Sequence, residues 1–83
     1  MSAFAYIELQ DVPISLKESA SWRIDETNGA HLVSFDGCPL IGEMTGIGNV
    51  MQTVEYPFPR NTQIRSDLIA WLMHWGIHFR VVM

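Results

Sequence analysis

The last stretch of this chain, residues 61–83, constrains the fold most, because a helix pattern and a strand pattern stand side by side there. The apolar residues before Gly76 recur at the 3.6-residue period of a helix that buries one face. These residues are Ile64, Leu68, Trp71, Leu72 and Trp75. Gly76 favours the left-handed conformation that ends a helix, and the residues after it alternate as in a half-buried strand. The pattern predicts a helix over about residues 62–75 and a final strand over 77–82.

Strand and turn signals occupy most of the chain before that helix. Residues 3–9 alternate as a first strand, and Pro13 interrupts the chain after them. Asn28-Gly29 predicts a β-hairpin with a type I′ turn, because this pair readily adopts positive φ angles. Asp36-Gly37 repeats the signal and predicts a third strand over residues 38–42.

The remaining segment before the helix combines a loop with one more strand. The glycines at 46 and 48 favour a loop over residues 43–49, and residues 50–56 regain strand character. Eighty-three residues support a single compact domain over 1–83. The sequence therefore predicts an α+β domain, in which a small, mostly antiparallel sheet of about five to six short strands carries the C-terminal helix on one face.

Charge and composition limit the classes of partner. The net charge is −4 and the five basic residues are dispersed, which disfavours direct binding to nucleic acid. The nine acidic residues form no run either, so the sequence does not support an acidic surface that imitates nucleic acid. That question stays open. Only 17% of the residues are charged, against about 25% in average soluble domains. We expect part of the apolar surface to meet a partner.

The setting expected from the sequence is the cytoplasm, that of the host if the chain is phage-encoded. Cys38 is the only cysteine, which suits a reducing compartment and excludes an intramolecular disulfide. The first residues lack the pattern of a signal peptide, and no apolar stretch has the length of a transmembrane helix. We expect no association with a membrane.

Residues with catalytic or ligand-binding chemistry are sparse. Cys38 and His31 form the one thiol and imidazole pair that neighbouring strands would bring close, but a cysteine beside a turn more often packs as a small hydrophobe. The loop containing Gly46 and Gly48 lacks the lysine of a phosphate-binding loop. We therefore expect no enzymatic activity, cofactor or metal. The alternative is a small-ligand-binding or thiol-dependent catalytic domain that uses Cys38, His31 and this loop.

The remaining apolar residues indicate a partner surface. Ile69 and Met73 lie outside the apolar stripe of the helix, and Phe4 and Tyr6 share one face of the first strand. Single exposed hydrophobes are also ordinary, and that interpretation stays open. Our hypothesis is a non-enzymatic protein-protein interaction module that binds a larger protein or a second copy of itself. Its size and acidity suit a phage or mobile-element accessory protein that inhibits a larger host factor, such as a nucleic-acid-guided defence complex.

Overall fold

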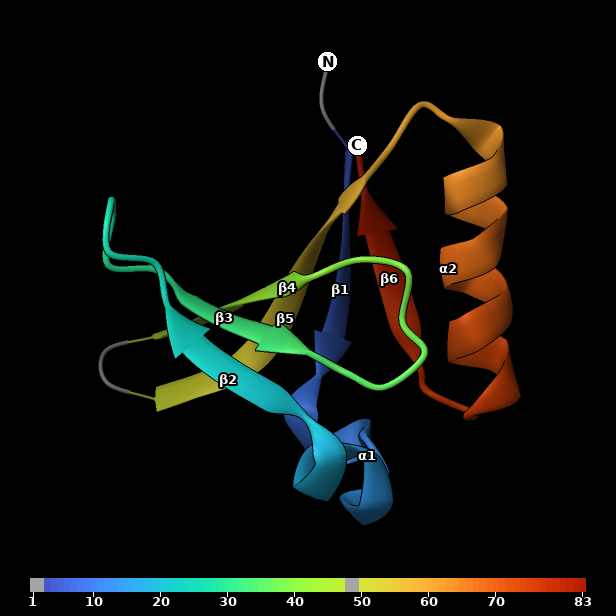
Figure 1. The fold of residues 1–83 in the computed structure, drawn as a ribbon. Helices are drawn as coiled ribbons and strands as arrows, with labels where there is room; N and C mark the ends of the chain where they lie inside the picture. The colour runs from blue at the N-terminus through green and yellow to red at the C-terminus, as the bar shows by residue number, and fades with distance from the viewer. Residues whose placement is uncertain (1–2, 48–49) are drawn as a thin grey trace.

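The computed structural model describes residues 3–47 and 50–83, which form one antiparallel sheet of six strands with helices packed against it (Figure 1). In chain order the elements are β1 (Ala3–Glu8), the 3₁₀ turn η1 (Leu9–Asp11), α1 (Ile14–Ser19), β2 (Ser21–Ile24), β3 (His31–Ser34), β4 (Gly42–Ile47), β5 (Val50–Phe58), α2 (Thr62–His74) and β6 (Phe79–Val82). The strands lie in the order β2-β3-β4-β5-β1-β6. The predicted α+β class, with a C-terminal helix and a final strand, is confirmed.

The two faces of the sheet follow from the alternation of side chains along each strand. In β1, Ala5 and Ile7 are buried on the face that α2 covers, whereas Phe4, Tyr6 and Glu8 point to the opposite, open face. The buried core consists of Ala5, Ile7, Val12, Leu16, Val33, Phe35, Met44, Val54, Tyr56, Leu68, Trp71, Leu72 and Ile77. The core therefore lies between one face of the sheet, α2 and the short helix α1.

Local sequence signals set the start of α2. The side chain of Asn61 accepts hydrogen bonds from the backbone N–H groups of Gln63 at 2.9 Å and Ile64 at 3.2 Å. These donors belong to the first turn, which has no partners of its own for them. Asn61 therefore fixes the first residue of the helix, close to the predicted boundary.

The end of α2 is equally local in origin. Gly76 has a φ of +67°, its N–H donates to the carbonyl of Met73, and the N–H of Ile77 donates to that of Leu72 at 2.9 Å. This is the Schellman arrangement, which brings the residue after the glycine against the last turn. Ile77 is buried because it completes this cap, and the final strand begins at Phe79, two residues later than predicted.

Two residues at this end of the chain differ from the predicted helix stripe and strand. Trp75 was expected in the core, but it is 36% exposed because it is the C-terminal cap residue of α2. Val81 lies on the core face beside Ala5, yet it is 37% exposed because β6 is an edge strand.

The segment between β3 and β4 differs most from the sequence-based prediction. The predicted third strand over residues 38–42 is wrong, and residues 35–41 form a connection that passes beside α2 (Figure 1). Trp71 of α2 stacks on Phe35, with ring centroids 6.0 Å apart, and its Nε1–H donates to the carbonyl of Asp36 at 3.2 Å. Pro39 lies in this segment and has no N–H for a ladder. The connection is thus held by the helix and not by strand pairing.

The loop predicted over residues 43–49 is also wrong across its described part, because β4 runs to Ile47. The ladder between β4 and β5 shifts register between Thr45 and Gly46. A glycine in such a position commonly marks a β-bulge within a strand. Gly48 and Asn49 lie outside the described residues.

The β2–β3 hairpin is confirmed, but its turn is not of type I′. Gly29 has a φ of +72°, and no other described residue of the turn has a positive φ. The backbone of Asp25 pairs with Ala30 and Gly29, and side chains add to this, since Asp25 accepts from the N–H of Thr27 and Asn28 accepts from that of Ala30. The connection is therefore longer than a two-residue turn, and a single positive φ is sufficient for it.

Candidate interaction surfaces

The outer side of α2 carries the first pair of predicted partner-binding residues. Met73 is 71% exposed and Ile69 is half-buried. Their helix also presents polar residues to solvent, among them Gln63, whose amide donates to Asp67 at 3.0 Å. Met73 is therefore an exposed apolar group on a helix whose other exposed residues are mainly polar.

Phe4 and Tyr6, the second predicted pair, lie on the open face of the sheet, away from α2. Their rings are 6.4 Å apart, and the Tyr6 hydroxyl donates to the Glu55 carboxylate at 2.9 Å. This hydrogen bond is the main reason that the pKa of Tyr6 is raised above its ordinary value. The structure thus keeps each predicted pair together but places the two pairs on different sides of the molecule. Their role in binding stays a prediction.

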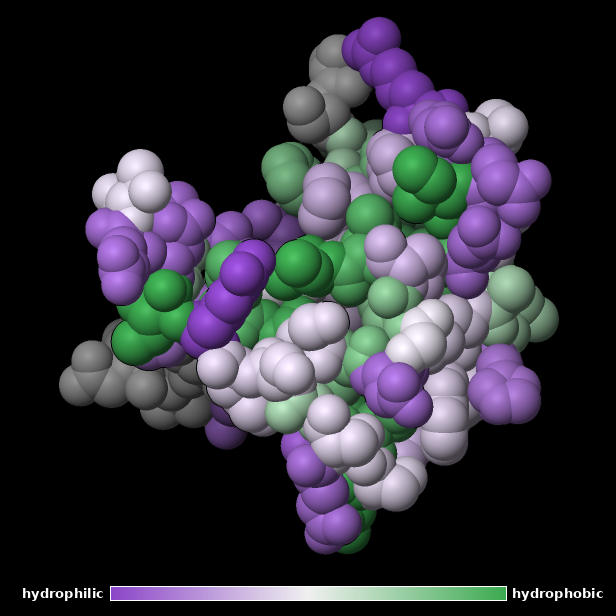
Figure 2. Space-filling view, viewed as in Figure 1, coloured by the Kyte–Doolittle hydropathy of each residue, from purple (hydrophilic) through white to green (hydrophobic). Residues whose placement is uncertain are grey.

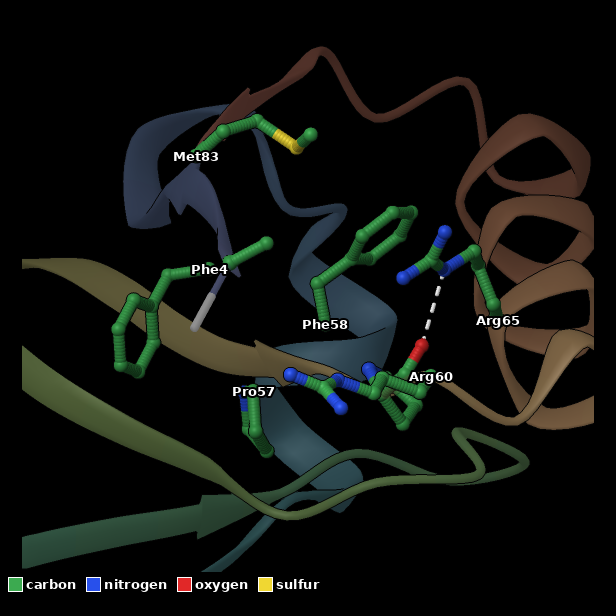
Figure 3. Close-up of a pocket in the computed structure, with 8 residues that line it drawn as sticks. Phe4, Pro57, Phe58, Arg60, Arg65 and Met83 are labelled. Atoms are coloured by element: carbon green, nitrogen blue, oxygen red, sulfur yellow. Dashed lines mark hydrogen bonds between the residues drawn. The ribbon is translucent and has the colours of Figure 1, made fainter. Parts of the chain in front are cut away.

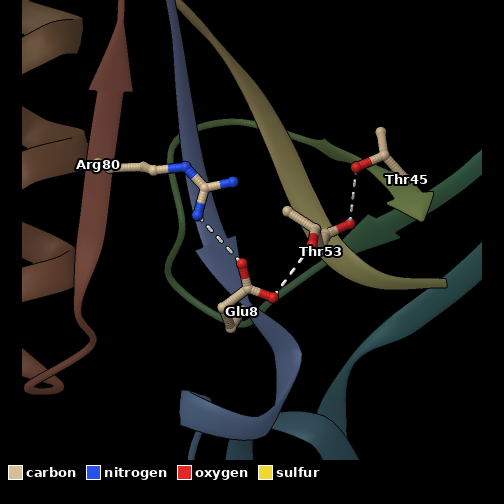
Figure 4. A network of polar contacts seen from close by, with 4 residues as sticks. All are labelled: Glu8, Thr45, Thr53 and Arg80. Atoms are coloured by element: carbon tan, nitrogen blue, oxygen red, sulfur yellow. Dashed lines mark hydrogen bonds and ion pairs between the residues drawn. The ribbon is translucent and has the colours of Figure 1, made fainter. Parts of the chain in front are cut away.

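Polar contacts among Glu8, Thr45, Thr53 and Arg80 join the strands on the open face (Figure 4). Glu8 forms an ion pair with Arg80 at 3.2 Å and accepts a hydrogen bond from the Thr53 hydroxyl at 3.0 Å. The Thr45 hydroxyl donates to the carbonyl of Thr53 at 3.4 Å. These contacts join β4, β5, β1 and β6, so the side chains of this face already have a structural role.

Cys38 and His31 lie on different segments, His31 in β3 and Cys38 in the connection after it. His31 begins β3, whereas Cys38 is held by its N–H to the carbonyl of Phe35 at 3.1 Å. Phe35 is four positions after His31, so the two Cα atoms lie about 13 Å apart if the chain is extended at about 3.3 Å per residue. Burial raises the pKa of the Cys38 thiol, and a neutral thiol is a poor nucleophile. The thiol-dependent alternative stays a prediction.

A buried hydroxyl lies close to this cysteine. Tyr56 is fully buried, and its hydroxyl has no hydrogen-bond partner in the described part of the chain. Its pKa is strongly raised, first by burial and then by the neighbouring Cys38. Such an unpaired polar atom costs stability, and the close packing around it offers no substrate an approach.

The surface that the sequence analysis missed is the edge strand β2. All four of its residues are exposed, and its backbone pairs with β3 on one side only. Trp22 and Ile24 stand on the core face but are 50% and 59% exposed. On the face shown in Figure 2, hydrophobic atoms lie on the β2–β3 hairpin below its hydrophilic tip. Alternation alone predicted an ordinary strand here, because exposure depends on the position of β2 in the strand order.

Comparisons with protein-family models, curated proteins and solved structures gave no match. Within residues 3–47 and 50–83, no three His, Cys, Asp or Glu side chains gather in a way that would hold a metal ion. In the same part of the chain, no helix combines the length and apolar character needed to cross a bilayer.

Proposed function

We propose that this chain is a non-enzymatic protein-protein interaction module that binds an extended segment of a larger protein along the free edge of β2. The observation that carries the proposal is the uncovered edge with its exposed Trp22 and Ile24. An edge strand presents unpaired N–H and C=O groups, and an extended segment can pair with them as an added strand. Backbone pairing supplies affinity, and side-chain contacts supply specificity.

Both faces of this edge offer contacts to an added strand, whose side chains would alternate between them. On the core face, Trp22 and Ile24 are accessible, and tryptophan is enriched among the residues that dominate binding energies. On the open face, a hollow of about 240 Å³ contains Leu32 and the 47% exposed Ile41. Alternate apolar residues of the partner segment would fill these positions.

Charge and size favour a larger partner over a second copy. Asp25 and Glu26 follow β2 and line a hollow of about 320 Å³ together with Arg23, so a lysine or arginine of the partner would meet two carboxylates and one guanidinium there. A net charge of −4 opposes self-association. The four residues of β2 extend only about 13 Å, too little for the roughly 800 Å² per partner of a stable interface. The rest of the contact area would come from the body of a larger protein.

Selection of peptides from a displayed random library tests the proposal without a known partner. We expect enriched sequences to alternate apolar residues and to carry a basic residue at one end. Bound peptide should slow hydrogen exchange of the backbone amides of β2. The variants Trp22→Lys and Ile24→Lys should abolish binding, whereas Val82→Lys, which changes an exposed apolar residue on the opposite edge strand β6, should bind as the wild type does.

Several outcomes contradict the proposal. Three results would each exclude the β2 edge as the docking site. They are failure to enrich any peptide, equal binding by Trp22→Lys, and slowed hydrogen exchange in β6 or α2 instead of β2. Sedimentation of the protein alone tests whether a second copy of the chain occupies the β2 edge. A dimer that the Trp22→Lys variant dissociates would show that the partner is a second copy and not a larger protein. An inhibitory action on a host factor, as expected for a small acidic accessory protein, remains a proposal that depends on identifying this partner.

A further inference from the structure

A pocket of about 550 Å³ lies where the end of β5 leads into α2, away from the β2 edge (Figure 3). The residues that line it include Phe4 and Phe58, two prolines, and Arg60 and Arg65. This volume falls within the range of about 300–1,000 Å³ that is usual for small-molecule sites. Aromatic walls with a few polar groups are also typical of such sites.

The charge of this pocket is opposite to that of the whole chain. Arg60 and Arg65 are two of only five basic residues in a protein of net charge −4. None of the described residues that line the pocket is acidic. In the described part of the chain the ion pair is that of Arg80 with Glu8, so neither pocket arginine has a carboxylate partner there. The positive charge of the pocket is left for a group from outside.

Arg65 is held in an orientation that suits recognition of an anion. Its Nε–H donates to the carbonyl of Pro59 at 2.9 Å, and its guanidinium carbon lies 4.3 Å from the centre of the Phe58 ring. The hydrogen bond uses Nε, which leaves the two terminal nitrogens for an acceptor. A planar guanidinium fork matches the geometry of a carboxylate or a phosphate.

The other side of the pocket is also built on a restrained backbone. Pro57 and Pro59 fix their φ angles on either side of Phe58, which limits the motion of this segment before binding. Arg60 follows directly, and its side chain runs back towards Pro57 (Figure 3). Both arginines line the pocket, Arg60 from the turn after β5 and Arg65 from the first part of α2.

We propose that this pocket binds a small organic anion, whose carboxylate or phosphate group contacts Arg60 and Arg65 while a planar ring packs against Phe58. A single anionic group can be held inside the pocket. A long polyanion such as nucleic acid would also meet the nine acidic residues distributed over the chain. The ligand class is thus a compact aromatic acid or aryl phosphate.

Four probes test this proposal by amide NMR and calorimetry: phenyl phosphate, benzoate, inorganic phosphate and benzyl alcohol. We expect phenyl phosphate and benzoate to shift the amides of Phe58, Arg60 and Arg65. Inorganic phosphate lacks the ring and benzyl alcohol lacks the charge, so each should bind about tenfold or more weakly than phenyl phosphate. Tighter binding of phenyl phosphate assigns a phosphate group to the ligand, and tighter binding of benzoate assigns a carboxylate.

Variants separate the pocket from general electrostatic attraction. Arg60→Gln changes an exposed side chain and should weaken phenyl phosphate about tenfold without changing the melting temperature. Arg65→Lys keeps the charge but removes the fork, and a similar loss is expected. The matched control is Arg23→Gln, which removes an exposed arginine on β2. Three results would overturn the proposal. They are equal weakening of phenyl phosphate binding by Arg23→Gln, wild-type binding by Arg60→Gln, and no amide shift with phenyl phosphate or benzoate at millimolar concentration.

Discussion

Gly42 at the start of β4 offers the sharpest test of the packing described above. A Cβ atom at this position would overlap Cγ1 of Val54 and lie 3.0 Å from Cε1 of Tyr56. Both neighbours are fully buried on the core face, so neither side chain can turn outwards to make room. Replacing a glycine within a strand by alanine usually stabilises a protein, because glycine loses more conformational entropy on folding. Here the added Cβ should instead push the sheet and its core apart and destabilise the protein.

The expected loss lies at the upper end of the 1–3 kcal/mol typical of overpacked cores, about 3 kcal/mol. A domain of this size is stable by about 4–12 kcal/mol, so this loss is a substantial fraction of the total. At about 4–8 °C per kcal/mol, the melting temperature should fall by about 12–24 °C. Urea unfolding followed by tryptophan fluorescence measures the free energy, and circular dichroism measures the melting temperature.

The double variant with Val54→Ala isolates the steric cause. Val54→Ala removes the methyl group that the new Cβ would overlap, so Gly42→Ala should cost about 1 kcal/mol or less in that background. Gly29→Ala is the control for glycine itself, because it has open space around it and a φ of +72°. Its free energy of unfolding should fall by only about 1–2 kcal/mol, which is the cost of placing alanine in the left-handed conformation. A wild-type melting temperature for Gly42→Ala, or strictly additive effects in the double variant, would refute the reasoning.

Two further predictions concern buried aromatic residues. Tyr56→Phe removes the unpaired hydroxyl and should raise the unfolding free energy by about 1 kcal/mol at neutral pH, measured by urea unfolding. Because folding raises the pKa of Tyr56, wild-type stability is complete below about pH 10 and falls above it, and Tyr56→Phe should reduce that alkaline loss. Trp71→Ala should cost about 3–5 kcal/mol, whereas Trp71→Phe keeps a ring against Phe35, loses the bond to Asp36 and should cost about 1–2 kcal/mol. An equal loss for both Trp71 variants in thermal melts would contradict the stacked geometry.

The parts of the fold that the sequence predicted correctly depend on contacts between near neighbours in the chain. Asn61 caps α2 through residues two and three positions away, and Gly76 ends it through the turn just before. The connection after β3 was predicted wrongly because its path depends on Trp71, 35 positions from its hydrogen-bond partner Asp36. A turn signal such as Asp36-Gly37 indicates a change of direction but does not determine where the next strand begins.

The candidate surfaces show the same limit. Helical periodicity correctly left Met73 outside the core, since it needs only the residues of one helix. The exposure of Trp22 follows from β2 lying at the edge of the sheet, which periodicity within the strand does not reveal. The anionic-ligand pocket likewise joins Phe4 near one end of the chain to Phe58 and Arg65 near the other. Only the pairing of β1 with β5 brings these residues together.

The strand order also makes the two proposed sites independent. β2 and β5 are separated by β3 and β4, so three steps of about 4.8 Å place at least about 14 Å between the docking edge and the strand that leads into the pocket. A segment added to β2 extends the sheet away from Arg60 and Arg65, and an aromatic anion beside Phe58 contacts none of the exposed residues of β2. Binding of phenyl phosphate should therefore be unchanged by Trp22→Lys, and selected peptides should bind Arg60→Gln as they bind the wild type. If either variant impaired both activities, the two surfaces would belong to one larger interface, and the strand order would no longer separate them.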